Sequence, residues 1–208
     1  RYRKNGIWLK GLLDSGDLGE IEKFYFYEGG KYNWPVTTDS FWKKESAGGG
    51  VLFDTGAHTI DQLCWWLSDI KLLRYEDDEL GGVEADCRIR FKLVNGATGL
   101  VELSRTRTLG ATAKIKGTKG TIEIGLVDSF LSAEPKSLLH KEYNGILGTK
   151  IPVQSYVDLI ISQINNWIDG IVNNSSNYVT GKDVIPSISI IEECYKNKQH
   201  WHLPWVEI

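Results

Sequence analysis

Near its start, the chain changes from the hydrophobic spacing of a helix to that of a strand. Residues 5–14 predict a helix, because their apolar side chains recur at helical spacing. These side chains are Ile7, Trp8, Leu12 and Leu13. Ser15-Gly16 can end the helix, since glycine tolerates the left-handed conformation common after a last turn. Residues 21–28, IEKFYFYE, are dense in aromatic side chains and favour a strand.

A second, longer apolar segment follows three consecutive glycines. Residues 51–67, VLFDTGAHTIDQLCWWL, have the length and the three-four spacing of a largely buried helix. Gly48-Gly49-Gly50 can be interpreted as an anion-binding helix start or as a place where the backbone passes close to a neighbour. Neither GxGxxG nor GxxxxGK[ST] occurs, which favours close approach.

The middle of the chain alternates with the period of two that strands require. Residues 87–94, CRIRFKLV, place Cys87, Ile89, Phe91 and Leu93 opposite Arg88, Arg90, Lys92 and Val94. Further strand-like runs are GLVELSRTRT, ATAKIKG and TIEIGL. Asn95-Gly96 and the turn 117–120 are hairpin signals, and such short turns join antiparallel strands. We therefore expect an antiparallel meander, with irregular edge strands over 128–151.

The last part of the chain predicts two helices. An apolar stripe at three-four spacing comprises Tyr156, Leu159, Ile160, Gln163, Ile164, Trp167, Ile168 and Ile171. After a polar loop over 173–178, Thr180 or Asp183 can cap a last helix, with Pro186 in its first turn. The side chains expected to face the core from this helix are Ile188, Ile191, Cys194 and Tyr195. The whole chain, 1–208, predicts one α+β domain: a large open, mixed and predominantly antiparallel sheet with helices mainly on one face.

Composition narrows the class of protein. The 208 residues hold 24 Lys and Arg against 27 Asp and Glu, a net charge of −3 that does not predict nucleic-acid binding. No apolar run reaches the ~18 residues of a membrane span, and no secretory signal is visible. Cys64, Cys87 and Cys194 are too scattered for a metal or disulfide pattern and predict reduced thiols in the cytoplasm. A start at Arg1 and the lack of any Met predict a fragment or a processed form.

Candidate chemistry lies on the helix after the glycines. Asp54, His58, Asp61 and Trp65 are spaced 4, 3 and 4 and share one helical face. Burying ionisable groups in so apolar a segment costs free energy unless they are paired or have a function. A carboxylate one helical turn from an imidazole suits proton transfer. Two alternatives stay open: a purely structural polar stripe, or a metal site, for which no further ligand is indicated. The acidic run over 76–79 is typical of a solvated loop.

Several segments resemble the C-terminal domain of the Gfo/Idh/MocA oxidoreductases. They are GDLGEI, AGGGVLFDTGAHTIDQLCWWL, GGVEADC, ELSRTR, KGTKGTIEI, TGKDVIPSISIIEECYKN and HLPW. The resemblance covers about Gly6 to Trp205, and its most specific part is the glycine stretch followed by DTGAH and Asp61.

The resemblance implies a substrate-binding and oligomerisation domain that is normally preceded by a Rossmann domain. That Rossmann domain binds NAD or NADP and carries the family's EKP lysine, and neither it nor the EKP motif is present here. Asp54 and His58 match the family's D-x-x-x-H, which implies substrate binding and proton transfer. Asp61 matches a common family position, with substrate binding or a structural role open.

We therefore expect the catalytic part of an NAD(P)-dependent oxidoreductase acting on a CH–OH group of a sugar, polyol or sugar derivative. The dinucleotide is expected upstream of Arg1, with no cofactor or metal in this chain. Trp34, Trp42 and Trp65 are pocket candidates, although core packing is also open for each. Self-association is expected through the sheet face that carries Val101 and Leu103. The alternatives are a non-catalytic interaction module of the same fold and a redox-assisted lyase or hydrolase.

Overall fold

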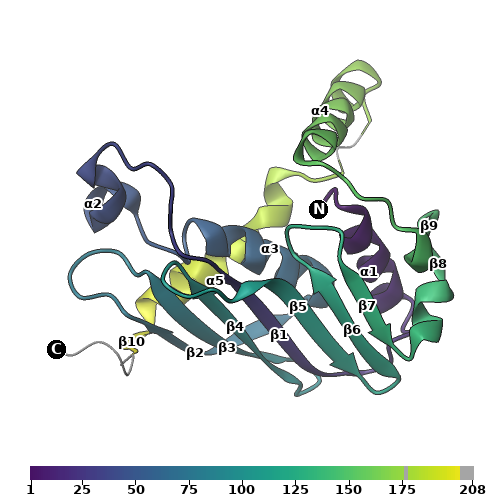
Figure 1. Cartoon of the computed structure of the whole chain (residues 1–208), viewed down its shortest axis with the longest axis horizontal. Coiled ribbons are helices and arrows are strands. Elements are labelled where there is room, and N and C mark those ends of the chain that lie inside the picture. Colours follow the sequence, from purple (N-terminus) through teal and green to yellow (C-terminus); the bar gives the residue numbers. More distant parts are fainter. Residues whose placement is uncertain (176–177, 202–208) are drawn as a thin grey trace.

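The computed structural model describes residues 1–175 and 178–201, and its elements form a sheet with helices around it (Figure 1). The α-helices are α1 (Lys4–Asp14), α2 (Lys44–Ala47), α3 (Thr55–Leu67), α4 (Tyr156–Val172) and α5 (Ile185–Lys196). The strands are β1 (Ile21–Gly29), β2 (Ile70–Asp77), β3 (Asp86–Leu93), β4 (Thr98–Ser104), β5 (Gly110–Gly117), β6 (Gly120–Gly125), β7 (Leu131–Glu134), β8 (Glu142–Tyr143), β9 (Ile146–Leu147) and β10 (Lys198–His200). Single 3-10 turns occupy Asp39–Trp42, Lys136–His140, Gly148–Lys150 and Gly181–Val184.

Eight strands form one mixed sheet in the order β10-β2-β3-β4-β1-β5-β6-β7. Five of its seven strand pairs are antiparallel, and β1–β4 and β10–β2 are parallel. The predicted mixed, predominantly antiparallel sheet is confirmed, as are both hairpins. The predicted meander is wrong, because β1 lies between β4 and β5. A strand from the start of the chain fills that position, which no local turn signal reveals.

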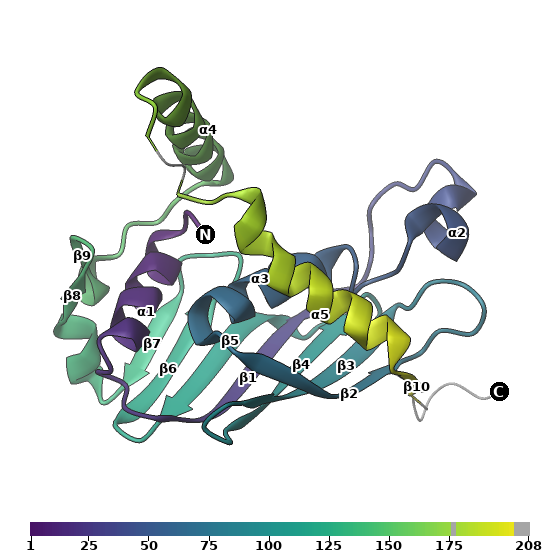
Figure 2. The same ribbon diagram turned by 180° about the vertical axis from the view of Figure 1, so that it is seen from behind.

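Helices α1, α3 and α5 cover one face of the sheet, and Figure 2 shows this helical layer from the front. The core lies between the two layers, and its largest fully buried side chains include Trp8, Phe24, Phe26 and Phe91. Val101 and Leu103 are also fully buried here. Their expected exposure on a free sheet face is therefore wrong, because the period of two turns them toward the helices.

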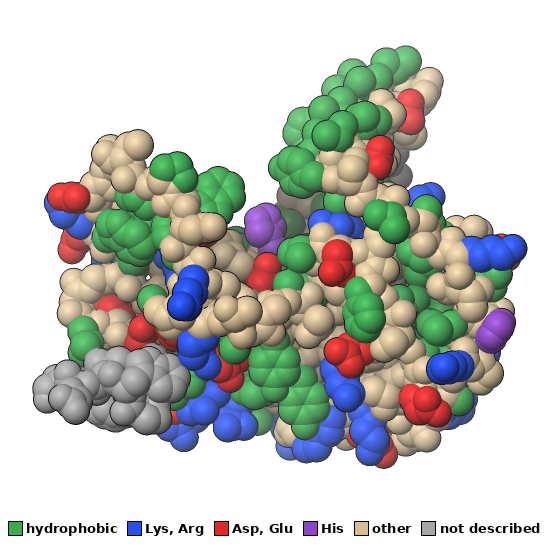
Figure 3. All heavy atoms as spheres, viewed as in Figure 1, with side chains coloured by type: hydrophobic (Ala, Val, Ile, Leu, Met, Phe, Trp, Pro, Cys, Tyr) green, Lys and Arg blue, Asp and Glu red, His purple; other side chains and the backbone are tan. Residues whose placement is uncertain are grey.

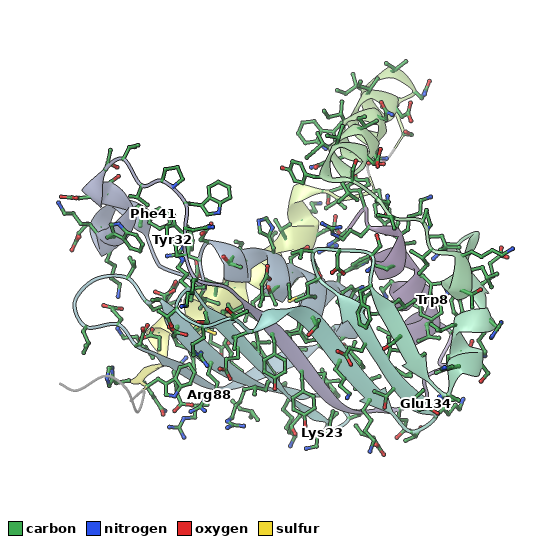
Figure 4. All side chains as sticks on the ribbon, in the orientation of Figure 1. Trp8, Lys23, Tyr32, Phe41, Arg88 and Glu134 are labelled. Carbon is green, nitrogen blue, oxygen red and sulfur yellow. The ribbon has the colours of Figure 1, made fainter. Side chains whose placement is uncertain are left out.

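The opposite face of the sheet is open and largely charged. Lys23 and Arg88 point away from the helical layer (Figure 4). Arg90, Lys92, Lys114 and Lys116 are exposed at the same alternating phase of their strands. The predicted alternation of CRIRFKLV is confirmed: Cys87, Ile89, Phe91 and Leu93 are buried, and the basic residues and Val94 lie on the other side.

Acidic residues at the end of β2 are buried, which corrects the expected solvated loop. Glu76 is 5% exposed and Asp77 is fully buried. Glu76 is neutralised by Arg74 at 2.8 Å and by Arg88 at 3.2 Å. Burial raises the pKa of Asp77. This end of β2 was missed because a run of acidic residues normally indicates exposure to solvent. Here Arg74 of β2 and Arg88 of β3 neutralise the buried Glu76 carboxylate.

The two C-terminal helices form where the sequence predicts them, but several of their apolar side chains are exposed. In α5, Ile191 and Cys194 are buried, while Ile188 is 44% exposed and lies outside the core. The α4 stripe is not a core face at all, since the helix contains no buried residue. The polar loop over 173–178 falls partly, and HLPW wholly, outside the described residues.

The three cysteines are free, and Cys87 and Cys194 are buried. Burial raises the pKa of Cys64 to about 12 and also raises the pKa of the other two thiols. Across 1–175 and 178–201, no helix combines the length and the apolar character that a membrane crossing requires.

Candidate active site

The loop that leads into α3 is fixed by one buried carboxylate. Glu84 accepts hydrogen bonds from the backbone N–H groups of Gly50 (2.9 Å) and Leu52 (3.0 Å). The Tyr195 hydroxyl donates a third bond to it at 2.8 Å. A Cβ on Gly50 would lie 1.9 Å from the Glu84 carbonyl oxygen. The close-approach interpretation of the glycines is therefore confirmed, and they leave no room to cradle a phosphate.

Asp54 stands at the start of α3, which begins at Thr55 rather than at Val51. It is the N-cap residue, but its carboxylate makes no capping bond to the helix. Instead, Arg105 Nη2 donates to Asp54 Oδ2 at 2.8 Å. The Asp54 side chain is 58% exposed, whereas that of Arg105 is 6% exposed. A buried cation thus holds an accessible carboxylate in place.

Aromatic rings surround the Arg105 guanidinium. Its Cζ lies 5.4 Å from the Tyr32 ring centroid and 4.8 Å from that of Phe41. These two rings stack on each other with centroids 5.4 Å apart, and Trp42 packs edge-on against both. Figure 4 shows Tyr32 and Phe41 in the lobe formed by the loop between β1 and α3. Arg105 therefore ties this aromatic lobe to Asp54 through cation–π contacts and an ion pair.

His58 is exposed one turn into α3 and makes no hydrogen bond to Asp54, although both residues are described. The carboxylate that interacts electrostatically with His58 is Glu28 at the end of β1. Burial raises the pKa of Glu28, while a hydrogen bond from the Thr59 hydroxyl and the charge of His58 oppose that rise. The imidazole is thus free to meet a ligand on its solvent side.

Two cavities meet at His58. The first, of about 730 Å³, is the aromatic-lobe cavity; it lies under the loop before α3. Its lining includes Tyr32, Trp34, Thr38, Asp54, His58 and Arg105. The second, of about 300 Å³, is the α3–α4 cavity, lined among others by Tyr2, His58, Gln62, Trp65, Tyr156 and Gln163. Apolar rings, hydroxyls, a carboxylate and an imidazole together suit a polyhydroxylated ligand.

Asp61 and Trp65, the other two residues of the predicted stripe on α3, lie on the side of the α3–α4 cavity and of Arg1. Asp61 is held by Arg1, whose Nε and Nη2 donate to its two oxygens at 3.0 and 2.8 Å. Trp65 is half-buried in the α3–α4 cavity, with Arg1 Cζ 5.9 Å from its ring centroid. The four-residue stripe therefore contains two separate ion pairs rather than one buried cluster.

Trp34 and Trp42 are not core residues. Trp34 is 76% exposed on the wall of the aromatic-lobe cavity, and Trp42 is 42% exposed. Core packing as the alternative for these two rings is wrong, because the loop that carries them stands off the sheet (Figure 1). A ring this exposed beside a carboxylate is available for stacking on a ligand.

The sequence pattern missed Arg105, Glu28 and Glu84. Arg105 follows β4 directly in ELSRTR, so its position at a strand end was the available signal. Glu28 is the penultimate residue of β1, also close to a strand end. Nothing local distinguishes Glu84, whose function depends on Gly50 and Tyr195, both far away in sequence.

Neither a metal nor a dinucleotide fits the residues that the structure describes. Within 1–175 and 178–201, no group of three or more His, Cys, Asp or Glu side chains is placed to hold a metal ion. The one glycine run ahead of a helix is filled by Glu84 and Tyr195. The described part of the chain therefore offers a ligand cavity without a pyrophosphate cradle.

The fold is an α+β domain whose cavities lie beside the start of α3. Sequence comparison shows which family this domain represents. A family model described as the GFO/IDH/MocA C-terminal domain matches residues 8–123, more than half of the chain. The chain belongs to this family. The matched range contains Asp54, His58 and Arg105. The comparison with curated proteins finds no match.

Solved structures share the fold at low sequence identity. The WlbA dehydrogenase from Bordetella pertussis, in complex with NADH and UDP-GlcNAcA, is 14% identical with a TM-score of 0.75, over 94% of this chain and 59% of that one. An oxidoreductase from Thermotoga maritima is 19% identical (TM-score 0.72; 94% and 58% covered). Levoglucosan dehydrogenase with NADH and levoglucosan is 18% identical (TM-score 0.67; 95% and 63% covered). This chain therefore spans about three fifths of these neighbours.

Proposed function

We propose that this chain is the substrate-binding and catalytic domain of an NAD(P)-dependent oxidoreductase that acts on a CH–OH group of a sugar, polyol or sugar derivative. The observation that carries the proposal is the meeting of Asp54 and His58 at the aromatic-lobe cavity. The solved neighbours support it, because two of those named above hold NADH with a sugar or a sugar nucleotide.

His58 is the proton acceptor in this proposal. Oxidation of an alcohol removes the hydroxyl proton and a hydride from the same carbon, and an imidazole suits the proton because it titrates near neutral pH. His58 lies at the cavity surface, free of hydrogen bonds to neighbouring described side chains, so a substrate hydroxyl can approach it. The charge of Glu28 interacts with that of His58 and favours the imidazolium that forms.

Asp54 takes a role different from the one its spacing suggests. Because its carboxylate is paired with Arg105, it acts on the substrate and not on the imidazole. The exposed oxygen of Asp54 accepts a hydrogen bond from a sugar hydroxyl, while Trp34 offers a ring for the apolar face of the sugar. Trp65 and Asp61 support the α3–α4 side, Asp61 through its bond to Arg1.

The nicotinamide cofactor is held outside these 208 residues in the same proposal, since no described segment fits a dinucleotide. NAD(P) supplies the hydride acceptor, and this chain supplies sugar binding and proton transfer. The free thiols are consistent with the cytoplasmic location that we propose.

The proposal is tested with the natural gene product that contains this chain. With NAD⁺ or NADP⁺ and a panel of sugars, sugar acids and polyols, reduced nicotinamide is expected to accumulate, as followed by its absorbance. Calorimetric titration of residues 1–208 alone with NADH is expected to show no binding. Saturable NADH binding by 1–208, or products of elimination or hydrolysis without net nicotinamide reduction, would contradict the proposal.

We also propose that copies associate through the open face of the sheet. Tyr25 pairs with Leu100 across β1 and β4, and Tyr27 pairs with Glu102. Lys114 of β5 lies on the other side of Tyr25. Two tyrosines and a leucine among charges of both signs suit a self-complementary contact better than plain solvent.

Sedimentation of 1–208 at micromolar concentration is expected to show a dimer or larger species. Tyr25→Glu is expected to shift it to monomer, because the added charge lies at the centre of the contact. Lys136→Glu is the matched control, since this exposed residue lies outside the large sheet. A monomer for the unmodified chain would contradict the sheet-face contact.

A further inference from the structure

The aromatic-lobe cavity is larger than a single sugar ring requires. Its volume is about 730 Å³, whereas the α3–α4 cavity measures about 300 Å³. Ligand cavities in proteins run from about 300 to 1,000 Å³, and one sugar ring belongs at the lower end of this range. Figure 3 shows hydrophobic side chains on the aromatic lobe and a hollow between the lobe and α4. The cavity therefore has room for a second unit beside a reacting ring.

One end of this cavity belongs to the reacting ring. Asp54, Ala57 and His58 come from the N-cap and the first turn of α3, and all three line the cavity. Arg105 reaches the same end, because its guanidinium pairs with Asp54 at 2.8 Å. A sugar ring bound here places one hydroxyl at His58 and another at Asp54, as the proposed function requires. These side chains form only part of the lining.

The other end of the cavity is formed by α2 and the loops around it. Phe53 lines the cavity, and a Cβ on Gly48 would lie 3.7 Å from its ring atom Cε1. The Ser46 hydroxyl donates to the backbone carbonyl oxygen of Ser40, and the Ser40 and Thr38 hydroxyls are hydrogen-bonded to each other. All four of these side chains line the cavity. We call them the outer patch: Thr38, Ser40, Ser46 and Phe53.

The outer patch combines an exposed ring with exposed hydroxyls. Phe53 is 49% exposed although its side chain is large and apolar. Thr38, Ser40 and Ser46 are also exposed. An aromatic face packs against the C–H face of a sugar ring, and neighbouring hydroxyls exchange hydrogen bonds with those of the sugar. The mechanism proposed for Asp54 and His58 makes no use of these four side chains.

Charge decides which second unit the outer patch accepts. Among the described residues, no lysine lines this cavity, and the side chain of its one arginine, Arg105, is 6% exposed and paired with Asp54. The Nε and Nη1 atoms of Arg105 are buried. On the lobe, Lys44 is engaged by Glu79 at 2.9 Å. A phosphate or carboxylate group would therefore meet the exposed Asp54 carboxylate without an accessible cation to neutralise it, which favours an uncharged unit.

We infer that the aromatic-lobe cavity binds two sugar units at once, so that the substrate is a neutral disaccharide and not a free monosaccharide; this inference rests on the proposed function. The ring that is oxidised lies at Asp54 and His58. The second unit lies on Phe53, among the hydroxyls of the outer patch. The glycosidic bond stays intact, because the oxidation removes only a hydroxyl proton and the hydride from the same carbon of the reacting ring.

Steady-state kinetics of the natural gene product with matched sugars test this inference. The probes are glucose with cellobiose and maltose, galactose with lactose, and UDP-glucose, each with NAD⁺ or NADP⁺. In the series that is oxidised fastest, kcat/KM is expected to be about 10-fold or more higher for the disaccharide than for its monosaccharide, because the second unit adds binding energy away from the reacting carbon.

Two variants of the outer patch probe the second unit. The readout is the ratio of kcat/KM for the disaccharide to kcat/KM for the monosaccharide. Phe53→Ala is expected to lower this ratio about 10-fold through loss of the stacked ring. Thr38→Ala is expected to lower it about 5-fold through loss of a hydrogen bond. Phe130→Ala is the matched control, since this phenylalanine is 46% exposed but lines neither cavity, and the ratio is expected to stay unchanged.

A monosaccharide kcat/KM that equals or exceeds that of its disaccharides would overturn the two-unit cavity and leave the proposed function standing. The same holds for a ratio that neither Phe53→Ala nor Thr38→Ala changes. UDP-glucose as the best substrate would assign the outer patch to a nucleotide and would also overturn the inference.

Calorimetric titration of the gene product with cellobiose, maltose and lactose, without NAD(P), measures binding separately from oxidation. Disaccharide binding that Phe53→Ala weakens, without nicotinamide reduction by any sugar, would reject the proposed oxidation and retain the two-unit cavity. Absence of both binding and nicotinamide reduction would reject both.

Discussion

Replacing His58 with alanine in the natural gene product is expected to lower kcat by about 10²–10⁴-fold, the usual loss when a positioned acid–base group is removed. The imidazole lies where the two cavities meet, and no other described histidine lines either of them. Without it, the hydroxyl proton has no acceptor as the hydride leaves. The measurement is steady-state turnover with the sugar that the gene product oxidises.

The fold is expected to survive this change. His58 is exposed and makes no hydrogen bond to a described side chain, so its loss should alter the free energy of unfolding by less than about 0.5 kcal/mol. His140→Ala is the matched control, because this exposed histidine lies on neither cavity. Full turnover in a folded His58→Ala enzyme would reject the proton-acceptor role.

Asp54→Asn separates the two carboxylate roles in the same assay. If Asp54 binds a substrate hydroxyl, losing its charge weakens that bond and the ion pair with Arg105, so KM rises. If Asp54 instead acts through His58, the pH profile of kcat shifts with little change in KM. The Arg105 ion pair favours the first result.

The elements that local sequence patterns specify were predictable. Residues 5–14, the hairpin at Asn95-Gly96 and the helix over the 156–171 stripe all form, because spacing and turn chemistry act within a few residues. The position of β1 in the sheet was not predictable in this way. It depends on pairing with β4 and β5, which lie more than 70 residues further along the chain.

In the candidate site, too, local spacing was predictable and long-range contacts were not. A four-residue spacing brings Asp54 and His58 to one end of α3, so both were found from the sequence. Their partners were missed, because Arg105 is 51 residues from Asp54 and Glu28 lies on a different element from His58. The apolar stripe of α4 was correctly assigned to a helix, but its exposure was not predicted. A periodic pattern gives the face of a helix and leaves open what covers it.

Replacing Glu84 with alanine is expected to destabilise the chain by about 3 kcal/mol or more, since each buried donor left without an acceptor costs about 1–3 kcal/mol. The donors are the amides of Gly50 and Leu52 and the Tyr195 hydroxyl. Because the loop they hold leads into α3, the position of Asp54 depends on them. Chemical denaturation of 1–208 measures the loss. Glu45→Ala, an exposed glutamate on the same segment, is the control and is expected to change stability by less than about 0.5 kcal/mol.

The size of this loss is expected to depend on pH. Burial raises the pKa of Glu84 above its usual value, although the bonds from Tyr195, Leu52 and Gly50 oppose that rise. Between the unfolded and the raised folded pKa, the native state binds more protons, so the contribution of Glu84 to the free energy of unfolding falls as pH rises. Glu84→Ala lacks this contribution. Its loss of stability relative to the unmodified chain should therefore be larger near pH 5, close to the pKa of an unfolded glutamate, than near pH 8. A deficit that grows with pH would mean that the ionised carboxylate is the favoured native form and would contradict this account of the loop.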